Sequence, residues 1–204
     1  MIDERFMYLA VLLIVWGAYA YIKDMYQSDT RPNLVTWFLW SVAPMIAFAA
    51  QLEAGVGPAA FLTLMVGLCP LAVFIAGLKK GQFRPSRFDL ICGGASVAAL
   101  ILWQLTGSGA VAVALSITAD GLAATPTLIK AYKDPRSESP FLFMLFAISA
   151  AITLLTLSTW SLEASGFSLY ILILYVTLFG LVKFQPGKSV GHPDRSDGQA
   201  AETS

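Results

Sequence analysis

One carboxylate, Asp120, lies in the middle of a long apolar stretch of the sequence. By helical rise it would sit about 15 Å from Lys130, at the end of that stretch. An ionised carboxylate in lipid is costly, so such residues usually face a bundle interior or a water cavity and mark a substrate, ion or proton site. The alternative is an aspartate that is protonated or hydrogen-bonded locally, for example to Ser116, and only supports helix packing. We expect Asp120 to bind substrate or a coupling proton.

Two tryptophans, Trp37 and Trp40, lie one helical turn apart, close to Asn33, near the start of another apolar run. Aromatic residues of this kind gather at membrane interfaces. They also offer flat faces on which a sugar or another solute can stack. Both interpretations stay open, and Asn33, Trp37 and Trp40 join Asp120 as candidate substrate-binding residues.

Prolines fall inside the apolar runs, with Pro44 central in one run and Pro126 shortly after Asp120 in another. A proline within a membrane helix removes a backbone donor and leaves a carbonyl that neighbouring groups must satisfy. The expected result is a kink. Such a kink serves either as a gating hinge or as a static packing feature.

Little in the sequence supports catalysis. Cys69 and Cys92 fall inside apolar runs and the single histidine, His192, lies in a polar tail, so they form no metal-ligand cluster or disulfide framework. No histidine or second carboxylate accompanies Asp120 for acid–base work. We therefore expect no enzyme, no metal and no cofactor. The net charge of zero gives no reason to expect nucleic acid as a partner.

The elements that must position these residues are transmembrane helices. The chain has 204 residues, of which 57% are hydrophobic and 13% charged, whereas a soluble domain is about 25% charged. A span of the hydrocarbon core needs roughly 17 to 25 mainly apolar residues. No run alternates with a period of two, which favours helices over a barrel. The predicted spans are 6–25, 33–52, 58–78, 89–106, 109–131, 141–161 and 166–184.

The basic residues predict the orientation of these spans, because Lys and Arg concentrate on the cytoplasmic side of short loops. They border the first, third and fifth loops and the C-terminal end, whereas Arg5 alone precedes the first span. We therefore expect the N-terminus outside and the C-terminus in the cytoplasm of a multi-pass protein, with the plasma membrane as its location. The residues concerned are Lys23, Arg31, Lys79, Lys80, Arg84, Arg87, Lys130, Lys133, Arg136, Lys183, Lys188 and Arg195.

A weak internal repeat appears when the chain is shifted by 106 residues, a pattern that many transporters share. It predicts an all-α membrane protein with two parallel three-helix repeats, residues 1–78 and 109–184, joined by a loop and linker helix over 79–108. Residues 185–204 are rich in Gly, Pro, Ser and charges and are expected to form a disordered cytoplasmic tail. The shift pairs Tyr26 with Tyr132, and Trp37 and Trp40 with Phe143 and Phe146.

The second copy resembles the PQ-loop motif. Residues 125–133 read TPTLIKAYK and are followed by Ser137-Glu138-Ser139 and an aromatic helix start. The family, which includes SWEET sugar transporters, cystinosin-like exporters and KDEL receptors, typically shows Pro-Gln, a short apolar stretch, Lys and a serine-containing turn. Here Thr127 stands at the glutamine position, and Ala20 and Tyr21 occupy the Pro-Gln positions of the first copy. The resemblance implies a hinge role for Pro126, Thr127 and Pro44.

The resemblance also implies a function. We expect a SWEET- or PQ-loop-like transporter that moves a small polar solute, such as a sugar or an amino-acid-like molecule, by alternating access. The competing hypothesis is a non-transporting membrane receptor or partner-binding subunit on the same fold. The expected partners are the solute and the lipid bilayer, and a homo-oligomer is left open. A central cavity at Asp120 would favour the carrier, whereas a solidly packed midplane would favour the alternative.

Overall fold

The chain folds into α-helices, as seen in a computed structural model that describes residues 3, 5–53, 58–105, 109–157, 160 and 162–187. A short 3₁₀ turn, η1 (Pro135–Ser137), precedes the sixth helix. The seven α-helices of the described part are α1 (Phe6–Gln27), α2 (Leu34–Glu53), α3 (Pro58–Lys79), α4 (Arg87–Leu105), α5 (Gly109–Lys133), α6 (Pro140–Thr156) and α7 (Leu162–Phe184).

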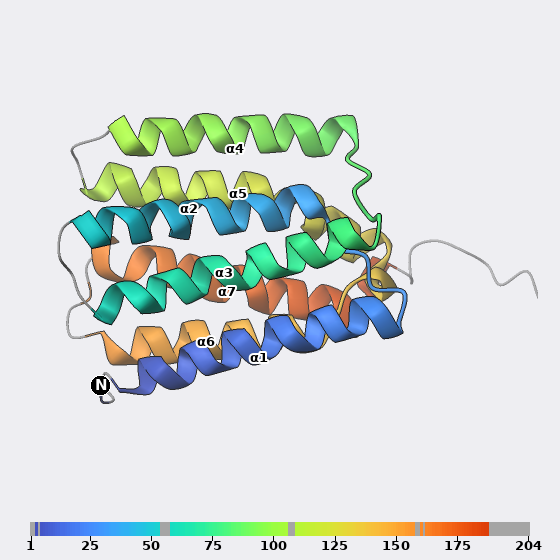
Figure 1. Ribbon diagram of the computed structural model, residues 1–204, viewed down its shortest axis with the longest axis horizontal. Helices are drawn as coiled ribbons and strands as arrows, with labels where there is room; N and C mark the ends of the chain where they lie inside the picture. Colours follow the sequence, from blue (N-terminus) through green and yellow to red (C-terminus); the bar gives the residue numbers. More distant parts are fainter. Residues whose placement is uncertain are drawn as a thin grey trace, which may run out of the picture.

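The helices lie lengthwise beside one another and alternate in direction, so that α1, α3, α5 and α7 run the same way (Figure 1). We call the end at which these four helices finish, and at which α2, α4 and α6 begin, the basic end. Apart from Arg5, every Lys and Arg among the described residues lies in or beside the helix ends and connections there. The charge clustering seen in the sequence is therefore a clustering at one end of the bundle.

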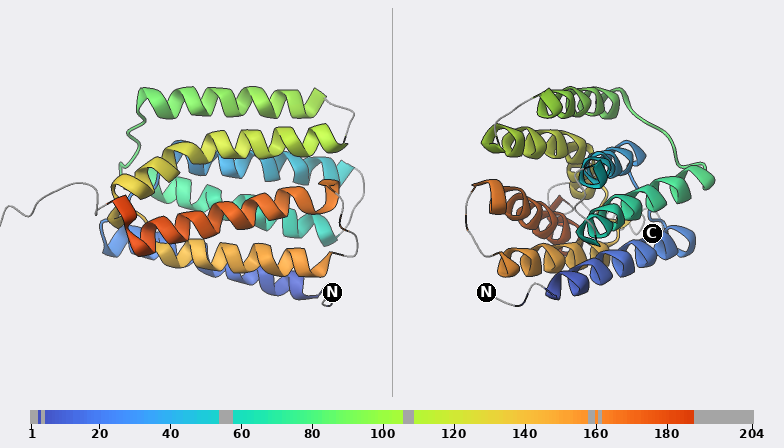
Figure 2. Two further views of the ribbon diagram at one scale, coloured as in Figure 1. Left: turned by 180° about the vertical axis from the view of Figure 1, so that it is seen from behind. Right: turned by 60° about the vertical axis from the view of Figure 1, so that its left-hand side comes forward.

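The contacts between helices follow a simple order. Helix α3 packs against both α1 and α2, and α7 packs against both α5 and α6. The two groups meet where α1 contacts α6 and where α2 contacts α5. Helix α4 packs on α5, also touches α2, and lies at an edge of the bundle in every view (Figures 1 and 2).

The outward surface of the bundle is apolar. Many large hydrophobic side chains are exposed along its length, including Leu12, Ile91 and Ile173. An exposed apolar surface of this extent needs a nonpolar environment. Of the described helices, Phe6–Gln27, Arg87–Leu105 and Ser165–Phe184 are long and apolar enough to cross a membrane, while Leu34–Met45, Leu64–Lys79 and Pro140–Thr156 are apolar but shorter. These are the features of a helical, multi-pass membrane protein.

The helix boundaries agree closely with the predicted spans, except at the connection between the last two. Helix α6 ends at Thr156, earlier than the predicted 161, and α7 begins at Leu162, earlier than the predicted 166. Residues 157–166 read LSTWSLEASG, a mixed stretch whose one charge, Glu163, lies inside α7, so apolar composition alone did not locate the boundary. Of the predicted tail, residues 188–204 lie outside the described part of the chain.

Local sequence signals fix the helix starts at the basic end. The Asn33 Oδ1 accepts a hydrogen bond from the Thr36 backbone N–H at 3.3 Å, as an N-cap residue does. Ser86 and Asp89 cap α4 reciprocally, because the Ser86 N–H donates to Asp89 Oδ2 at 2.6 Å and the Asp89 N–H donates to Ser86 Oγ at 3.1 Å. The Asn33 amide then donates to Asp89 Oδ1 at 2.9 Å and ties the two starts together.

Candidate functional site

A cavity of about 480 Å³ lies in the centre of the bundle and receives side chains from all seven helices. Pockets that hold small molecules in proteins usually measure about 300 to 1,000 Å³. The cavity extends from the middle of the bundle toward the end at which α1 begins. Its lining includes Ala123, Phe146 and Tyr175 in the middle, and Met7, Trp103 and Thr153 toward that end.

Asp120 lines this cavity from α5. Its side chain is half-buried, and its Oδ2 accepts a hydrogen bond at 2.9 Å from the hydroxyl of Tyr170 on α7. The tyrosine holds one carboxylate oxygen in place, and the other can face a molecule in the cavity. The structure therefore places Asp120 where a binding residue would lie, with a partner that the sequence did not reveal.

Trp40 lines the same cavity from α2 and is 6% exposed. Its indole N–H lies near the Asp120 carboxylate but does not reach it with hydrogen-bond geometry, and the described residues give it no other partner. A buried donor without a partner costs about 1 to 3 kcal/mol. A bound molecule that offers an acceptor beside Asp120 would recover that free energy.

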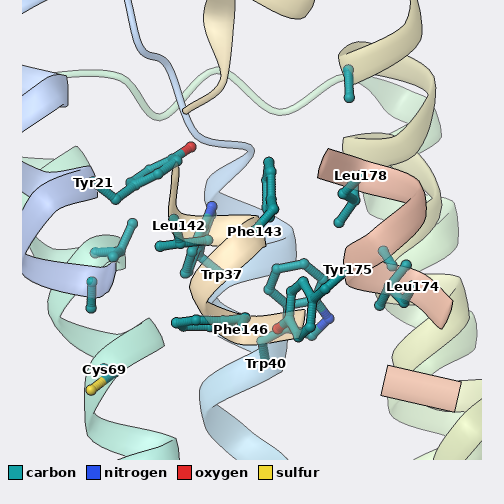
Figure 3. Packing of buried hydrophobic residues seen from close by; sticks show 14 of the residues in the cluster. Tyr21, Trp37, Trp40, Cys69, Leu142, Phe143, Phe146, Leu174, Tyr175 and Leu178 are labelled. Atoms are coloured by element: carbon teal, nitrogen blue, oxygen red, sulfur yellow. The ribbon is translucent and has the colours of Figure 1, made fainter. Parts of the chain in front are cut away.

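A layer of buried aromatic side chains, whose packing Figure 3 shows, lies on the basic-end side of the cavity and forms part of its wall. Trp40 packs edge-on against Trp37 and Tyr175, with ring centroids 5.4 and 5.8 Å apart, and Phe146 packs edge-on against Tyr175 at 5.0 Å. Trp37 is fully buried in this layer and contacts Tyr21. It does not line the cavity, so Trp37 belongs to the aromatic layer behind the cavity wall and Trp40 to the wall itself.

Beyond the aromatic layer, a buried carboxylate joins α1 to the end of α5. Glu138, just before α6, accepts hydrogen bonds from the Tyr21 hydroxyl at 2.5 Å and from Lys130 Nζ at 2.9 Å. Burial raises the pKa of Glu138 above its ordinary value of 4.5, and Lys130 and Tyr21 partly offset that effect. Next to it, the Ser139 hydroxyl donates to Asp24 Oδ2 at 2.5 Å, which adds a second link to α1.

Another set of hydrogen bonds across the bundle joins α2 to α5. The Thr127 hydroxyl donates to Thr36 Oγ1 at 3.0 Å, and the Thr36 hydroxyl donates to the Ala123 carbonyl at 2.6 Å. Thr127 and Thr36 are both fully buried. Pro126, inside α5, thus lies one residue from a point at which α5 is held by α2.

The predicted residues fall into separate groups. Asp120, Trp40 and Pro44 line the central cavity, and Trp37 and Thr127 lie between the cavity and the basic end. Asn33 and Pro126 instead line a different hollow at the basic end. Asn33 there caps α2, as described above, and does not line the cavity that holds Asp120.

Sequence reasoning did not single out Tyr170, Tyr175 or Glu138. The two tyrosines lie in a run that is apolar all round, so no periodicity indicates which of its residues face inward. Glu138 lies between serines in a loop, where a charged residue is normally solvated. The one available signal was its place in the serine-containing turn of the motif.

Comparison of the chain with protein-family models, with curated proteins and with solved structures found no match.

Proposed function

We propose that this chain is a membrane carrier for a small polar solute, similar to the PQ-loop and SWEET proteins. The observation that carries the proposal is the central cavity, which is lined from every helix and holds Asp120 beside an unpartnered indole N–H. A protein that served only as a scaffold could pack its midplane solid, as the interiors of proteins usually are.

The proposed architecture is seven spans in two parallel repeats, α1–α3 and α5–α7, with α4 as the connecting span. Among the six helices of the two repeats, exchanging the repeats gives the same set of contacting pairs. The contact of α1 with α6 corresponds to the contact of α5 with α2. Likewise α3, which packs on α1 and α2, corresponds to α7, which packs on α5 and α6. The repeat-related aromatic pairs also meet in the same layer, since Trp37, Trp40, Phe143 and Phe146 all belong to one buried cluster.

The two positions that correspond to the motif's glutamine also support the architecture of two parallel repeats. Tyr21 of the first copy and Thr127 of the second each donate a hydrogen bond across the bundle, to Glu138 before α6 and to Thr36 in α2 respectively. Both acceptors lie at the start of the second helix of the opposite repeat. We infer that this position joins the repeats and holds the basic end closed.

The basic end indicates how the bundle is oriented in the membrane. We infer that it faces the cytoplasm, because Lys and Arg are retained there, and that α1 begins on the outside of the plasma membrane. The cavity would then extend toward the outside, with the aromatic layer and the two cross-bundle links forming the closed cytoplasmic gate. Opening that gate requires the repeats to rock, and Pro44 and Pro126 provide the weakened helix positions for such bending.

The lining favours one kind of solute. Its described residues include the carboxylate of Asp120 and no Lys, Arg or His. An anion would therefore meet no counter-charge. We infer a solute that is uncharged or positively charged, with a donor for Asp120 and an acceptor for the Trp40 N–H, and with a nonpolar face for the aromatic wall.

The test is a stabilisation screen of the purified protein against sugars, amino acids and amines, with Asp120→Asn and Asp29→Asn compared with the wild type. Asparagine can still accept the bond from Tyr170, so Asp120→Asn should keep nearly the full thermal stability but lose the stabilisation by solute. Asp29→Asn is the matched control, since Asp29 is exposed and outside the cavity.

Equal solute affinity in the wild type and Asp120→Asn at every pH would remove Asp120 from the binding site. Binding that depends on Asp120 but never leads to solute uptake into vesicles would favour the receptor hypothesis over the carrier.

A further inference from the structure

A second hollow, of about 690 Å³, opens at the basic end between the starts of α2 and α4, the end of α5 and residues 80–86. Figure 1 shows these segments together at the end where α4 begins. Five cations line it, against two carboxylates. The cations are Arg31, Lys80, Arg84, Lys130 and Lys133, and the carboxylates are Asp89 and Asp134.

Some of these charges already have partners. Lys130 is paired with Glu138, and Lys80 donates to the Met25 carbonyl and lies over the Tyr26 ring. The Asp89 carboxylate accepts hydrogen bonds from the Ser86 backbone N–H and from the Asn33 amide, both neutral donors. Three exposed cations, Arg31, Arg84 and Lys133, have no ion-pair partner among the described residues. The hollow therefore has an excess of positive charge, because four cations without an ion pair in the described part of the chain, Arg31, Lys80, Arg84 and Lys133, outnumber the carboxylates of Asp89 and Asp134.

The cations stand beside exposed apolar side chains in the same hollow. Phe83 is 49% exposed, Phe88 46% and Ile129 39%. A free anion would need the cations alone. A lipid would use both, with its phosphate against the cations and its glycerol and upper acyl chains against the aromatic rings.

We propose that this hollow binds the phosphate headgroup of an anionic membrane lipid. Basic pockets between helices at the cytoplasmic membrane surface are known to suit such headgroups, and this one lies where the apolar helices end. The proposal rests on the membrane placement of the bundle, and it does not depend on transport or on the central cavity. Three unpartnered cations favour a headgroup with two phosphates, such as that of cardiolipin.

The experiment measures thermal stabilisation of the full chain, purified in uncharged micelles, by cardiolipin, phosphatidylcholine or inorganic phosphate. The wild type should respond to cardiolipin only. Replacing Arg31, Arg84 and Lys133 together by Gln should raise the apparent Kd for cardiolipin roughly 100-fold, since each cation near a surface contributes about a factor of five.

The matched control replaces Lys23, Lys79 and Arg136 together by Gln. These cations are also exposed at the same end but do not line the hollow. The apparent Kd should therefore stay within about threefold of the wild type, because surface charges outside a site contribute little. Equal weakening by both triple variants would reduce the effect to general surface charge and overturn the proposal.

A second pair of variants distinguishes a lipid from a free anion. Phe83→Ala and Phe88→Ala keep every cation and should weaken cardiolipin binding several-fold. Equal stabilisation of the wild type by inorganic phosphate and by cardiolipin would assign the hollow to a free anion, and no stabilisation by either would leave it without this function. Both results would contradict the proposal while leaving the carrier hypothesis unaffected.

Discussion

Glu138 provides the sharpest prediction about stability. Its side chain is fully buried and accepts bonds from Tyr21 and Lys130, whose side chain is 26% exposed. Glu138→Ala would leave an ammonium without its counter-ion and a buried hydroxyl without its acceptor. Removing one partner of a buried ion pair lowers the free energy of unfolding by about 3 to 5 kcal/mol. Because Lys130 is partly exposed, the expected loss for Glu138→Ala lies near the lower end of that range, about 3 kcal/mol.

The assay is the free energy of unfolding in micelles. Asp134→Ala, at an exposed carboxylate in the same loop, is the control and should change that free energy by less than about 0.5 kcal/mol. Glu138→Gln keeps an acceptor oxygen and should lose clearly less than Glu138→Ala. A Glu138→Ala protein within about 1 kcal/mol of the wild type would refute a buried pair at this position.

The pH dependence of the same variants follows from the raised pKa of Glu138. A carboxyl that holds its proton more tightly in the folded state than in the unfolded state favours folding at low pH. That contribution is complete below the ordinary pKa of 4.5 and is lost as the pH rises through the higher folded value. The wild type should therefore lose stability relative to Glu138→Gln over this rise in pH. If the wild type instead gained stability relative to Glu138→Gln as the pH rose, the pKa of Glu138 would not be raised in the folded state.

Two further predictions concern packing between helices. Thr36→Val removes the hydroxyl that bonds α2 to Thr127 on α5 and should cost about 1 to 3 kcal/mol of unfolding free energy in micelles; an unchanged value would show that this link does not hold the helices. Gly77→Ala places a methyl group against the Leu34 side chain and should destabilise by about 1 to 3 kcal/mol. Gly180→Ala meets open space and should be neutral or stabilising by up to about 1 kcal/mol, so the same sign for both glycine variants would contradict the packing.

The helices could be predicted from the sequence because their length and apolar composition are set by the environment that they occupy. The connection between α6 and α7 was the exception, because its Ser and Thr residues interrupt the apolar run without a Lys or Arg to mark a loop. The position of Asp120 in the centre of the bundle also followed, because a lone carboxylate in an apolar run must face something polar.

The rest depends on which helix faces meet, and apolar helices carry no such information. Tyr170 became the partner of Asp120 only once α5 and α7 were in contact. Trp37 and Trp40 are one turn apart, yet only Trp40 lines the cavity. The loop cations predicted orientation, but their convergence with Phe83 and Phe88 on one hollow needed the folded structure.

Access to the central cavity from both sides of the membrane tests the carrier hypothesis most directly, and it requires no knowledge of the solute. In a background with Cys69 and Cys92 replaced by Ala, a cysteine at Ala43 would lie on the cavity wall, and one at Ala124 would be fully buried away from it. The carrier hypothesis predicts that a membrane-impermeant thiol reagent labels Ala43→Cys from either side and leaves Ala124→Cys unlabelled. Labelling of Ala43→Cys from one side only would contradict alternating access, and labelling no faster than that of Ala124→Cys would contradict the cavity itself.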